Sequence, residues 1–118
     1  MKAFALFPKI YLYRPAVDMR KQLNGLSTLV AQAMSMDPFA DSLYVFCNQR
    51  RDLLKCIYWD KTGFAMWVKK LDAEKFRWPR KLSDEVIHLS SQQMSFLLDG
   101  YDILQMKKHK NLDYQKFI

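Results

Sequence analysis

Basic side chains gathered in two short segments are the residues of this chain best suited to chemistry. Two arginines stand together in the polar stretch 48–51, and a second basic group occupies 69–81, where Phe76 and Trp78 are interleaved with it. Guanidinium and ammonium groups bind phosphate oxygens, while aromatic rings can stack on unpaired bases. The chemistry that these residue types suggest is the binding of nucleic acid. The candidate phosphate-binding residues are Arg50, Arg51, Lys69, Lys70, Arg77 and Arg80.

Both segments also have an ordinary structural interpretation. Large aromatic side chains are usually buried, so Phe76 and Trp78 are expected to fill the core, with their charged neighbours solvated around them. Arg50 and Arg51 are expected to project from a hairpin tip, either free to reach a phosphate or simply solvated, with local pairing to Asp52 as a further alternative. For the basic residues together we favour nucleic acid.

The charge balance of the whole chain points the same way without proving it. Nineteen Lys and Arg stand against twelve Asp and Glu, which gives a net charge of +7 and an isoelectric point near 9.5. An excess of positive charge on a small protein favours a polyanionic partner, although many basic domains are merely well solvated.

A search for catalytic equipment finds none. The two histidines, His88 and His109, have no cysteine or carboxylate at ligand spacing, and the sequence holds neither a Gly-x-Ser-x-Gly elbow nor a glycine-rich phosphate loop. We therefore expect a protein that is not an enzyme and that uses no cofactor, metal or small-molecule substrate.

Cys47 and Cys56 are expected to be buried free thiols. Both lie in apolar runs, and no second Cys or His pair completes a zinc site. A four-residue hairpin tip at 48–51 would place them on one face of the sheet, roughly 13 Å apart along the strands. That separation excludes a disulfide between them.

The elements that must position these residues follow from hydrophobic periodicity and turn residues. A helix is expected at about 18–36, capped by Asp18 and ended at the Asp-Pro pair 37–38. A short helix at about 91–100 should begin with a capping box at Ser90 and end at Gly100. Apolar and aromatic runs predict strands at 10–14, 43–47, 53–59, 64–70 and 86–89.

These elements predict an α+β fold. The runs between 43 and 70 read as a three-stranded meander, with a type I turn at 60–63. We expect an antiparallel sheet of three to five strands, with the helix 18–36 packed on one face and the strand 10–14 able to join an edge. Residues 1–104 should form a single globular domain, followed by a basic, loosely held tail at 105–118.

Membrane insertion and export are not expected. No apolar run approaches the roughly 18 residues that span a bilayer, and the N-terminal apolar stretch is too short for a signal peptide. The expected location is the cytoplasm.

Taken in order, several short motifs make the chain recognisable. It resembles the TnpB accessory proteins, the second-open-reading-frame products of the IS-sixty-six family of bacterial insertion sequences, from about residue 10 to about residue 103. The motifs are Asp-Met-Arg-Lys at 18–21, Asp-Pro-Phe at 37–39, Val-Phe at 45–46, Arg-Arg-Asp at 50–52, Tyr-Trp-Asp at 58–60 with Gly-Phe at 63–64, Lys-Lys-Leu at 69–71, Phe-Arg-Trp-Pro at 76–79 and Leu-Leu-Asp-Gly at 97–100.

The resemblance implies a role in transposition. In that family a separate, larger transposase of the DDE type cuts and joins DNA, and the small protein is an accessory, so no catalytic residues carry over. The leading hypothesis is binding to DNA in support of the transposase. The alternative is a protein-interaction module that docks on the transposase or on a sister protein without contacting DNA.

Overall fold

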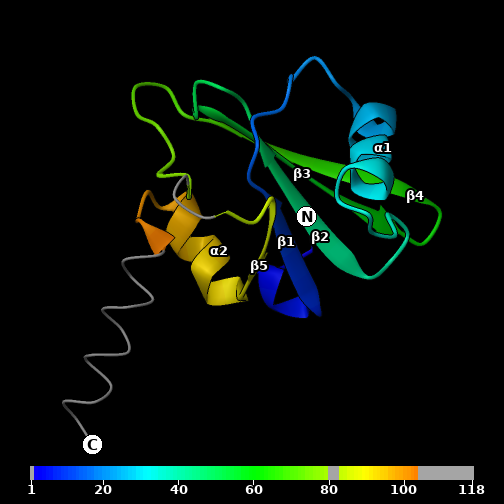
Figure 1. Ribbon diagram of the computed structural model, residues 1–118. Helices are drawn as coiled ribbons and strands as arrows, with labels where there is room; N and C mark the ends of the chain where they lie inside the picture. The colour runs from blue at the N-terminus through cyan, green and yellow to red at the C-terminus, as the bar shows by residue number, and fades with distance from the viewer. Residues whose placement is uncertain (1, 80–82, 104–118) are drawn as a thin grey trace, which may run out of the picture.

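The computed structural model describes residues 2–79 and 83–103, which form a five-stranded sheet with helices on both faces (Figure 1). No helix in this described part is long and apolar enough to cross a bilayer. In chain order, the elements are η1 (Phe4–Leu6), β1 (Lys9–Tyr13), α1 (Leu23–Gln32), β2 (Ser42–Cys47), β3 (Leu53–Asp60), β4 (Gly63–Lys70), β5 (Val86–Leu89) and α2 (Ser91–Leu98).

The sheet is mixed, with the strand order β4-β3-β2-β1-β5. The meander β2-β3-β4 is antiparallel, as the sequence predicts, but β1 runs parallel to β2 and antiparallel to β5. The expectation of a wholly antiparallel sheet is therefore wrong, whereas the strand near the N-terminus does join the edge of the meander, beside β2. The reason is the helix between β1 and β2, because a helical crossover returns the chain to the same end of the sheet and makes the next strand parallel.

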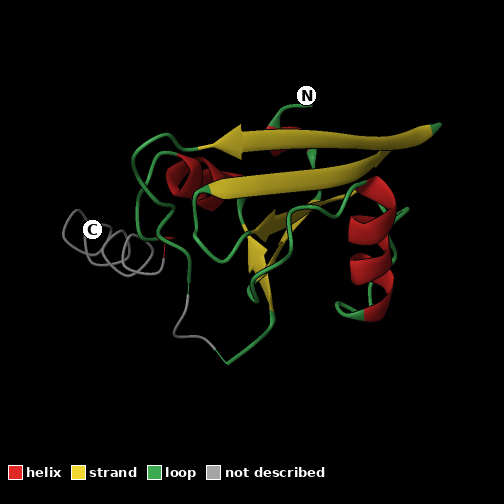
Figure 2. Ribbon diagram, turned by 90° about the horizontal axis from the view of Figure 1, so that it is seen from above, coloured by secondary structure: helices red, strands yellow, loops and turns green. Residues whose placement is uncertain are grey.

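Alternation along the strands divides the core between the two faces of the sheet. On one face, Leu26 and Val30 of α1 pack against Tyr44, Phe46 and Ile57. The opposite face carries the larger cluster, in which α2 lies over the sheet (Figure 2). Its best-buried members include Ile10, Leu12, Leu43, Val45, Leu54, Leu89, Met94 and Leu97. The packing of a helix on one face is confirmed.

Helix α1 is shorter than the predicted 18–36. It begins after Gln22, which makes no side-chain capping bond. Asp18 does not cap it, because the Asp18 carboxylate instead accepts bonds from the backbone N–H and the guanidinium of Arg20. At the other end the chain leaves the helix before the predicted stop, and Ser35 adopts a left-handed φ of 54°.

Helix α2 begins with the predicted capping box and ends at Leu98, slightly before the predicted end at 100. The Ser90 hydroxyl accepts a hydrogen bond from the Gln93 N–H, and the Gln93 side chain accepts one from the Ser90 N–H. This reciprocal pair satisfies two N–H groups that the helix leaves unbonded. Gly100 follows with a φ of 94°, a conformation that glycine adopts without strain.

The two hairpins of the meander differ from expectation at their turns. Lys61 has a φ of 54°, which excludes the predicted type I turn at 60–63. In the first hairpin, the Asn48 N–H bonds to the Leu53 carbonyl, so the tip starts one residue later than predicted. Cys47 therefore pairs with Leu54. Cys47 and Cys56 therefore stand only about two residues, or roughly 7 Å, apart along the strands. Both are free and buried, as predicted.

Neither thiol should react while the protein is folded. Cys47 and Cys56 are fully buried, and burial raises the pKa of the Cys47 thiol to about 11 and that of Cys56 still further. The thiolate is the reactive form, so alkylation by iodoacetamide at mildly alkaline pH should be slow in buffer and should reach two adducts per chain in denaturant. Mass spectrometry counts the adducts, and rapid double labelling of native protein would contradict this packing.

Candidate nucleic-acid interface

Three loops meet at one end of the sheet. The parallel strands β1 and β2 both end there, β3 begins there and β4 ends there, so the loops 14–22, 48–52 and 71–79 lie together at the top of Figure 1. Direct backbone bonds join them: Val17 N–H donates to the Cys47 carbonyl at 2.9 Å, and Phe76 N–H donates to that of Arg51 at 2.7 Å. We call the segments 14–22, 48–53 and 69–79 the basic end.

Positive charge is concentrated at the basic end. It carries nine Lys and Arg but only four Asp and Glu, whereas the opposite end, where the loops 36–41 and 61–62 lie, holds acids and bases in similar number. The basic residues are Arg14, Arg20, Lys21, Arg50, Arg51, Lys69, Lys70, Lys75 and Arg77. The acidic ones are Asp18, Asp52, Asp72 and Glu74. Within the described residues, the fold thus gathers most of the Lys and Arg side chains at one end and makes the potential there positive.

The two arginines of the hairpin tip have opposite environments. Arg50 is exposed, as predicted. The same prediction is wrong for Arg51, which is only 9% exposed and has a left-handed φ of 63°. The Arg51 side chain lies beneath the segment 71–79, and its guanidinium carbon is 5.6 Å from the centre of the Trp78 ring.

Arg51 and Trp78 together fasten the loops of the basic end to one another. The Trp78 indole N–H donates to the Arg14 carbonyl at 2.9 Å, and its ring faces the Arg51 guanidinium. Nε and Nη1 of Arg51 are buried without a hydrogen-bond partner, and the face of the Trp78 ring offers the charge a favourable contact. Phe76 and Trp78 are 2% and 5% exposed, which confirms that both belong to the core.

The remaining predicted residues are scattered over the same end. Lys69 donates to the Leu98 carbonyl at 3.0 Å and so binds the end of α2. Lys70 is exposed but paired with the Asp52 carboxylate at 3.1 Å, and hydrogen bonds from Asn48 and Lys70 lower the pKa of Asp52. Arg77 is exposed, and Arg80 lies outside the described residues.

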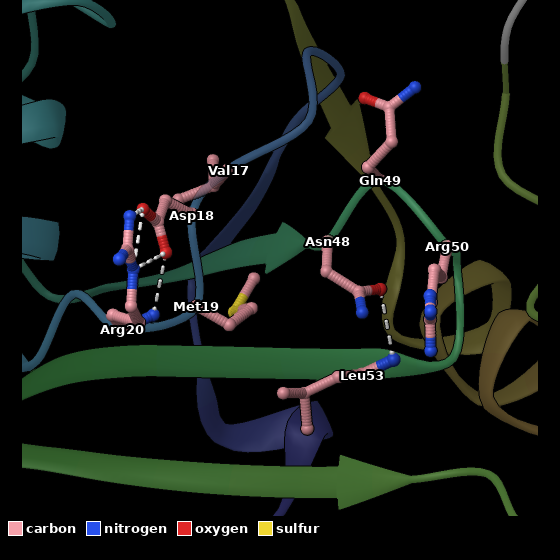
Figure 3. Close-up of a pocket in the computed structure, with 8 residues that line it drawn as sticks. All are labelled: Val17, Asp18, Met19, Arg20, Asn48, Gln49, Arg50 and Leu53. Atoms are coloured by element: carbon pink, nitrogen blue, oxygen red, sulfur yellow. Dashed lines mark hydrogen bonds and ion pairs between the residues drawn. The ribbon is translucent and has the colours of Figure 1, made fainter.

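A shallow groove of about 890 Å³ runs between the first two loops of the basic end (Figure 3). Arg20 and Arg50 both contribute to its lining, together with Asp18, Asn48 and Leu53. The Arg20 side chain is 92% exposed, and its hydrogen bonds lower the pKa of Asp18 to about 2. The helix predicted at 18–36 included Arg20, so Arg20 was not identified as a candidate binding residue. Only the parallel pairing of β1 and β2 brings the loop that carries it beside the hairpin tip.

Lys55 is a second residue that the sequence did not single out. It points from β3 toward the α1 face, is 6% exposed, and donates to the carbonyls of Met19 at 2.9 Å and Lys21 at 3.1 Å. The ammonium group thereby holds the loop that carries Arg20 against the sheet. Its only sequence signal is a lysine inside an otherwise apolar strand.

The described residues contain no group of three or more His, Cys, Asp or Glu side chains arranged to hold a metal ion. What they offer instead is a set of cationic groups held by a rigid sheet. Such a set can bind anions and exchange their counterions for protein contacts.

A comparison with models of known protein families identifies one family. The model of the family described as "IS66 Orf2 like protein" matches residues 8–108. The chain is similar to two uncharacterized proteins of Sinorhizobium fredii (strain NBRC 101917 / NGR234). It is 36% identical to y4jC over 85% of each chain, and 31% identical to y4hO over 80% of this chain and 81% of that one. No solved structure matches. The chain therefore belongs to the IS66 Orf2-like family of insertion-sequence proteins.

Proposed function

We propose that this chain is a non-catalytic accessory protein that binds DNA through its basic end, in support of a separate DDE-type transposase. Membership of the IS66 Orf2-like family supports the link to an insertion sequence. The observation that carries the DNA proposal is the collection of nine basic residues, from three segments distant in sequence, at one end of the sheet.

Phosphate contacts would come from the exposed cations of the basic end. Arg50 and Arg77 are exposed and form no ion pair within the described part of the chain, so they need break no contact to reach a phosphate. Arg20 would exchange the exposed Asp18 carboxylate for a phosphate at little cost, because exposed ion pairs are weak. Lys70 would leave the half-buried Asp52, whose carboxylate keeps its hydrogen bond from Asn48. Arg51 would serve by supporting the loops, and Lys69 by binding the end of α2.

The competing function is docking on the transposase or a sister protein. The exposed apolar side chains favour a protein contact, and Phe39, 58% exposed, lies against Trp59 and Phe64 at the end opposite the basic one. This surface is separate from the basic end. A protein partner there would leave the DNA proposal untouched.

Neutralising the basic end should weaken DNA binding and reduce its salt dependence. Each phosphate contact contributes roughly 0.9 to the slope of log affinity against log salt concentration, so Arg50→Gln with Arg77→Gln should lower the slope by about two. Fluorescence anisotropy with labelled duplex from the element ends measures both quantities.

The matched control removes the same charge elsewhere. Lys9→Gln with Lys61→Gln changes two exposed lysines at the opposite end and should leave the slope nearly unchanged. Equal losses from both pairs would mean that the whole charged surface binds without a defined site. No binding by the wild type even at low salt would reject the DNA function and favour the docking one.

A further inference from the structure

The outer margin of β4 is an unpaired strand edge. β4 is the last strand in the sheet order, and no described strand pairs with its far side. Because Leu71 N–H donates to the Asp52 carbonyl, the odd-numbered positions of β4 bond to β3. The backbone groups of Phe64, Met66 and Val68 therefore point outward.

This edge lacks the features that usually protect an edge strand. From Gly63 to Val68 it contains no proline and no charge, and its lysines, Lys69 and Lys70, stand only at its last two positions. Protected edges are typically short, charged or bulged. β5, the strand at the other margin, has only four residues, whereas β4 has eight.

Apolar side chains line the same edge. Phe64, Met66 and Val68 alternate onto the α1 face, and Val68 is 45% exposed. Phe39, 58% exposed, packs on Phe64 with ring centres 5.4 Å apart. Two of the large exposed hydrophobic side chains thus lie near opposite ends of one open strand.

We propose that β4 pairs with β4 of a second copy in antiparallel fashion, about a twofold axis at Met66. Outward-facing positions must face each other, which permits Met66 opposite Met66 and Phe64 opposite Val68. The two five-stranded sheets would then join into one continuous sheet. This pairing brings the exposed Val68 of each copy to the Phe39–Phe64 pair of the other.

Charge favours a second copy in this orientation. Antiparallel pairing sends Lys69 and Lys70 of the two copies to opposite ends of the interface, so no like charges stand directly opposite within the strand pair. A parallel arrangement would place the same lysines side by side. The strand is therefore complementary to itself in one direction, as a twofold interface requires.

Sedimentation of the full chain without DNA tests the interface independently of the proposed function. The wild type should form a dimer that dissociates on dilution through the micromolar range. Val68→Pro removes an outward N–H, which the bonding to β3 does not use, and should leave the protein monomeric with its circular dichroism unchanged. Val68→Thr, which keeps the N–H and the branched side chain, should still dimerise.

Cross-linking tests the register. Met66→Cys places a thiol at the twofold axis and should yield a disulfide-linked dimer under mild oxidation, whereas Ser95→Cys on the exposed face of α2 should not. A monomeric wild type at every concentration overturns the proposal. So does a dimer that survives Val68→Pro and does not cross-link through Met66→Cys.

Discussion

Replacing Trp78 with alanine is expected to lower the free energy of unfolding by about 3–5 kcal/mol, as for other large buried aromatics. Trp78 is 5% exposed, its N–H donates to the Arg14 carbonyl, and its ring covers the Arg51 guanidinium. The substitution removes the core contact, leaves a carbonyl without its donor and uncovers a buried charge. Urea unfolding followed by circular dichroism measures the change.

Three variants separate these contributions. Arg77→Ala, one position away and exposed, should change the free energy of unfolding by less than about 0.5 kcal/mol. Trp78→Phe keeps a ring but loses the hydrogen bond and should cost roughly 1–2 kcal/mol. A double-mutant cycle between Arg51→Ala and Trp78→Ala should give a coupling of about 1–2 kcal/mol, as expected for a desolvated cation over a ring. A coupling near zero would show that the ring does not stabilise the guanidinium.

Replacing Lys55 with methionine is expected to cost about 2–3 kcal/mol, although the substitution puts an apolar side chain in an apolar strand. The ammonium group satisfies the carbonyls of Met19 and Lys21, and methionine of similar length can donate to neither. Replacing a buried charge with an apolar side chain leaves stability unchanged only when the hydrogen-bond partners of the charge are replaced as well. The partners here are backbone carbonyls, which no substitution can remove. Chemical denaturation gives the loss.

Hydrogen exchange shows which part of the chain loses stability in this variant. In Lys55→Met, amides of the loop 14–22 should exchange faster while those of β3 and β4 remain protected, because the ammonium holds only that loop. Lys9→Met, at an exposed strand position, is the control and should alter neither quantity. If Lys55→Met proves as stable as the wild type, water must replace the ammonium at both carbonyls.

Local sequence signals predicted the parts of the fold that depend on neighbouring residues. The meander, β5 and the Ser90–Gln93 capping box all follow from patterns within a few residues, and all are present. Burial of Phe76 and Trp78 followed from side-chain size alone. In each of these cases, an interaction within a short segment is stronger than the alternatives that the same segment could form.

Features decided by distant contacts were missed. The parallel pairing of β1 with β2 depends on the path of the whole crossover. The cap expected from Asp18 failed for a local reason, because its carboxylate binds Arg20, two residues later. Arg51 is buried because a segment more than twenty residues later lies over it, which its position in a polar tip gave no reason to expect. The phosphate-binding set therefore stays a prediction, with Arg20 added by the fold.

The position of β1 inside the sheet governs the order in which the chain can fold. The meander can close from segments adjacent in sequence, but β1 must wait for β2 across a helical crossover and for β5, whose residue Leu89 pairs with Ile10. Contacts of such long sequence separation close slowly. During synthesis, β1 is thus made long before its partner β5, and until β5 emerges only the β2 side of its backbone can be paired.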